Sequence, residues 1–308
     1  MSTIKLAVIG VGKIARDQHR PALAANSDYE LVATASPHHR LEGVPHYPDL
    51  ETLLRSVPEV AAVAICTPPQ IRHRIARAAL EQGRHVLLEK PPGATLSEVA
   101  DLVELARARK LALFATWHSR EAAGVEPARR WLEGRTIRSI AITWKEDVRV
   151  WHPGQRWIFD AGGLGVFDPG INALSILTRI VPKAIVVEAA QLEFPANREA
   201  PIAAQLQLRT VCGAGVQADF DFRQTGPQTW DMEVVTNSGT LLLQKGGSVL
   251  RIDAGTPTEA PDREYHNLYA HFAQLVRARA IDCDVRPLQL VADAFLRGRR
   301  VNVDPFVD

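Results

Sequence analysis

The sequence predicts an α/β protein with a doubly wound parallel sheet at its N-terminus and a second, α+β domain built on an open, mainly antiparallel sheet. The chain has 308 residues, which is enough for roughly two domains. Residues 1–115 alternate short apolar runs with amphipathic stretches, a pattern typical of a parallel sheet. The later residues contain consecutive strand-like segments separated by turn signals. We therefore expect domains at 1–120 and 121–308.

In the N-terminal part, continuous apolar runs predict strands that are buried on both faces. They lie at 6–9, 31–35, 60–65, 85–88 and 111–115. Between them we expect helices at 13–25, 50–55, 71–81 and 97–109, with Ser97 as the N-cap of the last and Gly83 as the C-cap of the third. Ligands of such sheets bind at the carboxyl ends of the strands.

The C-terminal part predicts an antiparallel meander covered by few helices. We expect strands at 137–147, 184–194, 202–209, 215–222, 230–236, 239–244 and 248–252, and helices at 125–132, 265–280 and 287–300. Arg297, Arg299 and Arg300 then form a solvated helix end, and the last helix is a candidate to pack back on the first domain. Since few helices cover only one face of the sheet, we expect a homo-oligomer, a dimer, formed through the other face.

Charge and composition exclude several classes of protein. Lys and Arg number 36 against 35 Asp and Glu, which argues against binding to nucleic acid or to a membrane surface by bulk charge. The three cysteines, Cys66, Cys212 and Cys283, are too few and too far apart for a disulfide framework or a zinc motif, and we expect no metal. We find neither a signal-peptide pattern nor an apolar run of about 20 residues, so we expect a cytoplasmic protein without a membrane span.

A glycine-rich turn follows the first predicted strand. Residues 10–15, GVGKIA, match the pattern G-x-G-x-x-A at the start of a helix. Gly10 permits the tight turn, Gly12 lets the backbone approach a pyrophosphate, and Ala15 allows close packing of helix and strand. The free N–H groups of the helix attract phosphate. The sequence therefore predicts a dinucleotide-binding Rossmann domain.

The end of the second predicted strand bears on the choice of cofactor. A site specific for NAD usually has Asp or Glu there, whereas this chain has Ser36, followed by His38, His39 and Arg40. A hydroxyl does not repel a 2′-phosphate, and the basic side chains attract one. We therefore expect NADP, or use of both NADP and NAD.

The motif Glu89-Lys90-Pro91-Pro92, together with the glycine turn, resembles the glucose–fructose oxidoreductase and inositol dehydrogenase (Gfo/Idh/MocA) family. The segments 144–149, 151–155 and 162–173 are similar to those of its bacterial L-arabinose and D-galactose 1-dehydrogenases. The resemblance covers essentially the whole chain. It implies a Rossmann domain, a second domain whose open sheet commonly makes the dimer interface, and hydride transfer from the anomeric carbon of a pyranose to NAD(P)+. The expected cofactor-binding residues are Gly10, Gly12, Lys13, Ile14, Ser36, His38, Thr67, Pro68, Glu89 and Lys90.

The expected catalytic residues are Lys90, Asp168 and Asn172. Lys90 follows a buried strand and precedes two prolines, where its cation can stabilise developing alkoxide charge. Asp168 and Asn172 are four residues apart and share one face if a helix begins near Pro169, with Asp168 at its N-cap. Many relatives have His where this chain has Asn172, and an amide cannot accept a proton at neutral pH. The base is then Asp168, which we favour, or Lys90.

Further polar and aromatic residues suit a sugar, whose C–H faces pack on indole rings while its hydroxyls bind charged or amide groups. The expected substrate contacts are Lys90, His118, Glu146, Trp151, His152, Trp157, Asp168 and Asn172. Most of the six Trp residues are also expected in ordinary packing, because Trp is usually buried.

These features predict an NAD(P)+-dependent oxidation of an aldopyranose, L-arabinose or D-galactose, at C1 to the aldonolactone. One alternative from the same fold is a dehydrogenase of another sugar or polyol. A second alternative is a non-catalytic NADP-binding regulator, which would need neither Lys90 nor Asp168.

Overall fold

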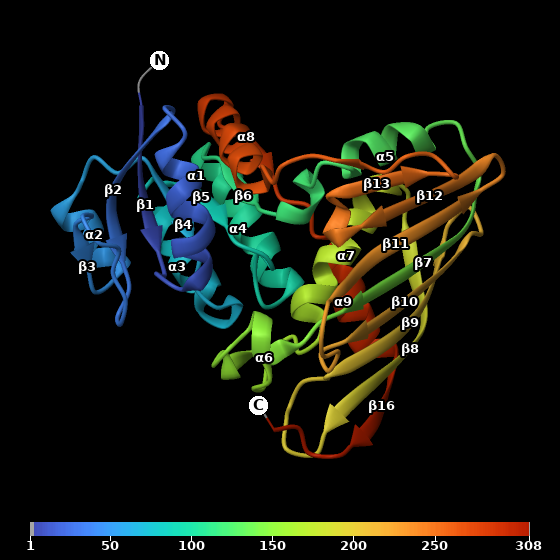
Figure 1. The fold of residues 1–308 in the computed structure, drawn as a ribbon. Helices are drawn as coiled ribbons and strands as arrows, with labels where there is room; N and C mark the ends of the chain where they lie inside the picture. Colours follow the sequence, from blue (N-terminus) through green and yellow to red (C-terminus); the bar gives the residue numbers. More distant parts are fainter. Residues whose placement is uncertain (1–2, 308) are drawn as a thin grey trace. The chain divides into compact units, whose positions relative to one another are not determined.

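Two sheets organise the protein, and each belongs to its own unit of the computed structural model, which describes residues 3–307 (Figure 1). The first unit comprises the chain up to Trp117 together with Tyr265–Val285. The second comprises His118–Glu264 and the residues from Arg286 onward. The division therefore differs from the expected one in that a later segment returns to the first unit.

The first unit contains a seven-stranded sheet in the order β15-β6-β5-β4-β1-β2-β3. All of its paired strands are parallel. The strand order reverses between β1 and β4, as in a doubly wound sheet, so the predicted fold class is confirmed. The strands are β1 (Ile4–Ile9), β2 (Tyr29–Ala35), β3 (His46–Tyr47), β4 (Ala62–Ile65), β5 (His85–Leu88), β6 (Leu113–Ala115) and β15 (Ile281–Asp282).

Helices cover both faces of this sheet and bury two apolar clusters against it. One cluster involves α2 (Leu50–Ser56), α3 (Pro69–Glu81) and α4 (Leu96–Arg109), and the other η1 (Ala15–His19), α1 (Arg20–Ala24) and α8 (Glu264–Ala278). The N-cap of α4 is Thr95, which accepts the Glu98 N–H, and not Ser97 as expected. The helix that returns to the parallel sheet is the penultimate helix, α8, rather than the last one.

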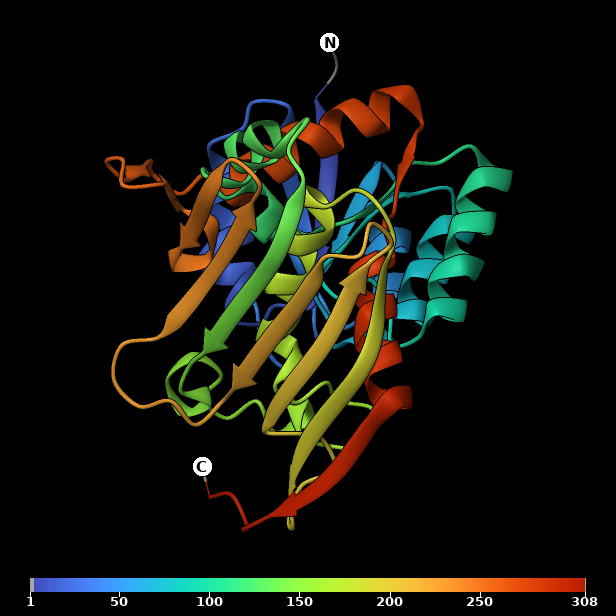
Figure 2. The ribbon, with the colours of Figure 1, turned by 90° about the vertical axis from the view of Figure 1, so that its right-hand side faces the viewer.

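The second unit contains a nine-stranded sheet in the order β14-β13-β12-β11-β7-β10-β9-β8-β16 (Figure 2). Most pairs are antiparallel, but β10 with β7 and β16 with β8 are parallel, so the sheet is mixed and is not a simple meander. The strands are β7 (Ile137–Lys145), β8 (Ile185–Pro195), β9 (Ala203–Thr210), β10 (Gly215–Asp221), β11 (Thr229–Thr236), β12 (Gly239–Gln244), β13 (Val249–Ile252), β14 (Thr258–Glu259) and β16 (Gly298–Val303).

The helices of this unit lie on one face of its sheet (Figures 1 and 2). They are η2 (His118–Glu121), α5 (Val125–Leu132), α6 (Val148–Trp151), η3 (Arg156–Ile158), α7 (Phe167–Ile180), η4 (Lys245–Gly247) and α9 (Arg286–Arg297). The expected helix at 287–300 is too long, because Arg299 and Arg300 belong to β16, which pairs with β8. These two arginines are therefore strand residues and do not form a helix end.

The opposite face of this sheet is polar along β9 and β10, whereas β8 places the exposed side chain of Val186 on it. Along β9 and β10 the outward positions are Gln205, Gln207, Arg209, Gln217 and Asp219, and all of them alternate with buried apolar residues. Ion pairs join neighbouring strands across this face, among them Lys145 with Asp219 and Arg209 with Glu188. An antiparallel sheet of this kind can face water. The predicted homo-oligomer through this face therefore stays a prediction.

None of the helices formed by residues 3–307 combines the length and the apolar character that crossing a bilayer requires.

Candidate functional site

The glycine turn of the first unit follows β1 and opens onto a helical segment. Gly10 has φ +90°, and a Cβ there would lie 2.9 Å from the Thr67 backbone nitrogen. A Cβ on Gly12 would meet nothing within 4 Å. Gly10 is thus required by the turn itself, whereas Gly12 leaves open space beside the backbone. Such space beside the start of a helix is what a dinucleotide pyrophosphate occupies in Rossmann domains.

Two hydroxyl side chains lie at the carboxyl ends of β2 and β4, the two strands that flank β1. Ser36 follows β2 and is buried, and no carboxylate occupies its position. Thr67 follows β4, and its buried Oγ1 has no hydrogen-bond partner among the described residues. A buried hydroxyl without a partner costs free energy unless a ligand or water satisfies it. The turn, these hydroxyls and the open space at Gly12 therefore fit a nicotinamide dinucleotide.

The other expected cofactor residues lie around these strand ends. Lys13 is exposed and pairs with Asp17, and Ile14 is the N-cap of η1. His38 is exposed beyond Ser36, and Pro68 is the N-cap of α3. The cofactor role of Lys13, Ile14, His38 and Pro68 stays a prediction.

The loop after β5 is held by a buried arginine that the sequence analysis missed. The guanidinium of Arg72, which is 3% exposed, donates to the backbone oxygens of Thr67, Glu89 and Pro91. These bonds fasten the ends of β4 and β5 to α3. The Lys90–Pro91 peptide bond is cis, and Lys90 is half-buried.

Glu89 lies in a fully enclosed polar cluster of the first unit. Its Oε1 accepts from the hydroxyl of Tyr265, at 2.9 Å, and lies 3.0 Å from Nε2 of His19. Its Oε2 accepts the main-chain N–H of Lys90 at 3.0 Å. His19 Nδ1 lies 2.7 Å from the hydroxyl of Tyr269. Glu89, which was expected to bind cofactor, is 3% exposed and is engaged by protein groups.

The electrostatics of this cluster favour a charged imidazole. Burial by itself lowers the pKa of His19, but neighbouring Cys66, Tyr269 and Glu89 outweigh it and raise the pKa well above its ordinary value. The carboxylate of Glu89 lies 3.0 Å from Nε2 of His19 and is one of these raising contacts. Burial also raises the pKa of Tyr269 to about 12, so that its hydroxyl keeps its proton. His19 then donates to both Glu89 and Tyr269.

In the second unit, α7 carries Asp168 and Asn172 on one face. The helix can approach β10 because Gly170 has no side chain, and a Cβ there would lie 2.8 Å from the ring of Phe220. Asp168 lies in the first turn and not at the N-cap, which is Val166, because the helix begins two residues earlier than expected. Asp168 is 4% exposed and Asn172 is half-buried.

A histidine links Asp168 to a second carboxylate. His152 Nδ1 lies 3.7 Å from Asp168 Oδ2, and its Nε2 lies 3.3 Å from Glu146 Oε1. Glu146 follows β7, where its N–H is held by the Asp221 carbonyl, and His152 follows the short helix α6, whose N-cap is Asp147. The sheet and α6 thus bring together three of the residues that the sequence predicted for substrate.

Tryptophans border this acidic cluster. Trp230 Nε1 donates to Glu146 Oε2 at 2.8 Å, and its ring centroid lies 4.8 Å from that of Trp151, which is 39% exposed. Trp144 stacks with Trp230, and their ring centroids lie 5.9 Å apart. The sequence analysis did not single out Trp230. Its only signal was its place at the start of a strand, and the pairing of Trp230 with Trp144 across β11 and β7 explains its position.

Two other predicted substrate residues lie apart from the contacts of this cluster. His118 pairs with Glu264, with Nδ1 2.6 Å from Oε2. Trp157 belongs to η3 and is half-buried. Among residues 3–307, no group of three or more His, Cys, Asp and Glu side chains is arranged to hold a metal ion.

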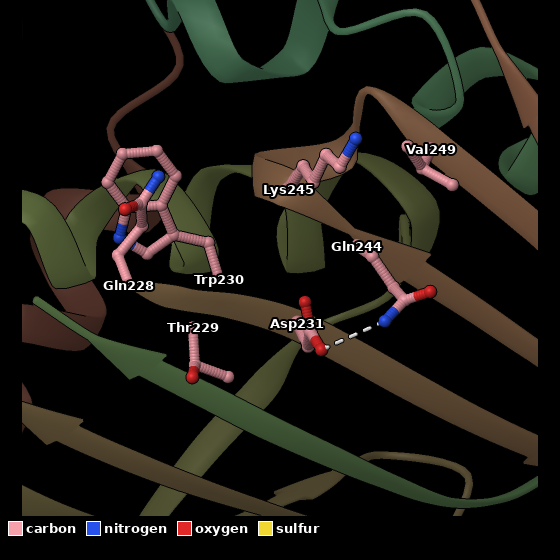
Figure 3. A pocket seen from close by; sticks show the side chains of 7 residues that line it. All are labelled: Gln228, Thr229, Trp230, Asp231, Gln244, Lys245 and Val249. Atoms are coloured by element: carbon pink, nitrogen blue, oxygen red, sulfur yellow. Dashed lines mark hydrogen bonds between the residues drawn. The ribbon is translucent and has the colours of Figure 1, made fainter. Parts of the chain in front are cut away.

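A pocket of about 230 Å³ lies beside Trp230 in the second unit (Figure 3). Its lining residues come from β11, β12, β13 and the turns next to them: Gln228, Thr229, Trp230, Asp231, Gln244, Lys245 and Val249. Gln244 donates to Asp231 at 3.2 Å within the pocket. Trp230 lines this pocket and also donates to Glu146 of the Glu146–His152–Asp168 cluster.

Comparisons with known proteins agree with this architecture. Residues 4–116 match GFO_IDH_MocA, described as an oxidoreductase family with an NAD-binding Rossmann fold. The chain is 44% identical over 308 residues to a galactose 1-dehydrogenase from Pseudomonas fluorescens, and the match covers 100% of both proteins. It is 26% identical over 259 residues to a D-glucoside 3-dehydrogenase from Escherichia coli (strain K12), covering 80% of this chain and 68% of that relative.

Solved structures give the same result. A D-galactose-1-dehydrogenase protein from Rhizobium etli superposes with a TM-score of 0.95 at 53% identity, covering 100% of this chain and 99% of that one. A 3-ketoreductase from Actinomadura kijaniata, solved with NADP and TDP-benzene, has a TM-score of 0.84 at 21% identity and covers 98% and 100%; it shares the fold. This chain therefore belongs to the Gfo/Idh/MocA family of oxidoreductases, and its first unit is an NAD-binding Rossmann fold.

Proposed function

We propose that the protein is a sugar 1-dehydrogenase that oxidises an aldopyranose at C1 to the aldonolactone, with NADP+ or NAD+ as hydride acceptor. The observation that carries this proposal is the similarity to galactose 1-dehydrogenases over the whole chain, at 44% and 53% identity. D-galactose is therefore the first candidate substrate. L-arabinose is the second, because it has the same configuration at the matching ring carbons and lacks only the exocyclic CH2OH.

Asp168 is the proposed base. It takes the proton of the C1 hydroxyl while the C1 hydrogen leaves as hydride, so that C1 becomes the lactone carbonyl. His152, 3.7 Å from Asp168, stands where it can orient this carboxylate and pass on its proton. Asn172, one helical turn further along α7, can only hold a hydroxyl, because its amide accepts no proton at neutral pH.

The remaining side chains of the second unit are proposed to bind the sugar. The buried carboxylate of Glu146 can accept hydrogen bonds from sugar hydroxyls. Trp230 and His152 hold this carboxylate in place. The exposed ring of Trp151 offers an apolar surface for the C–H face of a pyranose. His118 and Trp157 remain proposed substrate contacts on the strength of the family resemblance.

Lys90, from the first unit, is the proposed electrostatic partner. Its ammonium hydrogen-bonds the reacting oxygen and stabilises the alkoxide charge that develops as the proton leaves. The nicotinamide cofactor supplies the hydride acceptor. Gly10, Gly12 and Thr67 are proposed to hold its phosphates, and Ser36 with His38 is proposed to accept a 2′-phosphate, which favours NADP.

Two other functions remain in competition. A dehydrogenase of a different sugar or polyol would use the same Rossmann domain, and a D-glucoside 3-dehydrogenase is 26% identical to this chain. A non-catalytic NADP-binding regulator would not need the Asp168–His152–Glu146 cluster. The predicted homodimer is tested separately, by measuring the mass of the protein in solution by light scattering.

Transfer of the C1 hydrogen tests the proposal directly. D-galactose carrying deuterium at C1 is incubated with the protein and NADP+ or NAD+, and the reduced nicotinamide is analysed by mass spectrometry. We expect one deuterium in the reduced cofactor and a lactone that hydrolyses to galactonic acid. Reduced cofactor without deuterium would place the oxidation at another carbon, and no reduction with any sugar would favour the regulator.

A further inference from the structure

The buried polar cluster around Glu89 contains ionisable groups that the proposed reaction does not use. His19 is 0% exposed and ends the π-helical turn η1, which follows the glycine turn. Tyr265 and Tyr269 lie one turn apart on α8. Three segments that are distant in the sequence therefore converge on one carboxylate.

Glu89 connects this cluster to Lys90. One of its oxygens is held by His19, at 3.0 Å, and by Tyr265. The other accepts the main-chain N–H of Lys90, also at 3.0 Å. Because the same carboxylate is held on one oxygen by His19 and Tyr265 and holds the Lys90 N–H with the other, the groups that fix Glu89 also restrain the backbone from which the Lys90 side chain starts.

The charges of the cluster fit this role. The raised pKa of His19 keeps its imidazole positive, and the buried carboxylate of Glu89 beside it supplies the opposite charge. Tyr265, Tyr269 and Cys66 are the other titratable groups that face the imidazole. A buried ion pair contributes little net stability compared with apolar side chains of the same volume. A gain in stability alone therefore does not account for charges buried beside Lys90.

We propose that His19 is a positioning residue for Lys90 and that it acts through the carboxylate of Glu89. The inference rests on the proposed function, because it takes Lys90 as the group that stabilises the reacting oxygen. It also couples the helix that follows the glycine turn to the catalytic lysine. A displacement of a catalytic group by about 1 Å can lower a rate by about 100-fold.

A double-mutant cycle tests the pathway through Lys90. We expect His19→Gln to lower kcat for D-galactose by roughly 10- to 100-fold and to leave the KM for the sugar within about threefold. In the Lys90→Ala background the same change should cost less than about twofold, because the group on which it acts is gone. If the double variant instead loses kcat by the product of the two single-variant factors, the two residues act independently and the proposal is overturned.

Two further variants control for misfolding. Tyr269→Phe removes only the hydroxyl that His19 contacts and should lower kcat in the same direction by a smaller factor. His73→Gln is the matched control, because His73 is a partly exposed histidine of the same unit that pairs with Asp101. It should leave kcat unchanged. An unchanged kcat in folded Tyr269→Phe and His19→Gln would contradict the inference.

A second readout does not depend on the substrate. The Cε of Lys90 is followed by NMR in protein labelled with 13C at lysine Cε. Its signal is identified as the one that is missing from the Lys90→Arg variant. We expect this signal to move in His19→Gln and to stay in place in His73→Gln. A signal that stays in place in both variants overturns the inference. If the wild type oxidises no sugar while the signal moves, the proposed function fails and the positioning role stands.

Discussion

The imidazole of His152 lies 3.7 Å from the carboxylate of Asp168, measured from Nδ1 to Oδ2, and it connects Asp168 to Glu146 on its other side. Asp168 is 4% exposed and Glu146 is 2% exposed. Two buried carboxylates therefore lie on either side of one imidazole, the nearer at 3.3 Å and the other at 3.7 Å. The proposed base, Asp168, belongs to this arrangement.

Replacing Asp168 by asparagine removes the proposed base and keeps its shape. We expect kcat for D-galactose to fall by a factor on the order of 100 to 10,000, because an amide accepts no proton. The measurement is the initial rate at saturating sugar, with circular dichroism to verify folding. Near-normal turnover in the folded variant would assign the base to another group.

Trp230→Phe tests whether Glu146 has to be held in place. The change removes the N–H that donates to Glu146 Oε2 at 2.8 Å and keeps an aromatic ring. Loss of a hydrogen bond to a charged group costs about 1.5 to 3 kcal/mol, so the KM for the sugar should rise by roughly tenfold or more. Trp131→Phe is the control, since Trp131 lies on α5 and its ring packs against the guanidinium of Arg135 at 4.2 Å. If the two variants have the same KM for the sugar, Trp230 has no role in sugar binding.

Alanine substitutions at the two glycines of the turn should affect different properties, stability at Gly10 and cofactor binding at Gly12. Gly10→Ala puts a Cβ 2.9 Å from the Thr67 backbone at φ +90°, so the free energy of unfolding should drop by about 1 to 2 kcal/mol or more. Gly12→Ala meets nothing within 4 Å and should leave that free energy nearly unchanged while it weakens cofactor binding. Denaturation and cofactor titration distinguish the two. A stable Gly10→Ala protein that binds cofactor normally would contradict this account of the turn.

Ser36→Asp should reverse any preference for NADP. A carboxylate at the end of β2 repels a 2′-phosphate and can bind the 2′-hydroxyl of NAD, so kcat/KM should fall by roughly tenfold or more for NADP+ relative to NAD+. Ser36→Ala, which adds no charge, should change the ratio much less. Equal losses with both cofactors would show that the ribose site lies elsewhere.

The stability contributed by His19 should depend on pH. Its pKa in the folded protein is raised above the value of about 6.5 expected in the unfolded chain. Its contribution is therefore fully present below about pH 6.5 and is lost as the pH rises through the folded pKa. The difference in unfolding free energy between the wild type and His19→Gln, measured by urea denaturation at several pH values, should shrink as the pH rises above 6.5. A difference that grows over that range would mean that the imidazole is neutral in the folded protein.

Much of the Rossmann domain follows from local sequence. The continuous apolar runs predict β4 and β5, and the glycine pattern predicts the turn after β1, because these features need no distant contact. The short strands β3 and β15 have two residues each and carry no pattern of their own. They form because they add to the edges of a sheet that is already in place.

The site could be predicted only in part. Glu146, His152 and Asp168 were identified by resemblance, but their order, with the histidine between two carboxylates, depends on the pairing of β7 with β11 and on the approach of α7 to β10. Arg72 and His19 were missed because they lie inside helices, where buried charges look like ordinary helix residues in a sequence. Their roles depend on contacts with Glu89, which lies 17 positions from Arg72 and 70 positions from His19 in the sequence.

The initial rate of nicotinamide reduction tests the central claim most directly. It is measured with D-galactose and with L-arabinose, each with NADP+ and with NAD+, on the wild-type protein and on Asp168→Asn. Oxidation of a pyranose at C1 predicts turnover with at least one sugar, a higher kcat/KM with NADP+, and loss of that turnover in the variant. No reduction in any of the four pairings would contradict the proposed function.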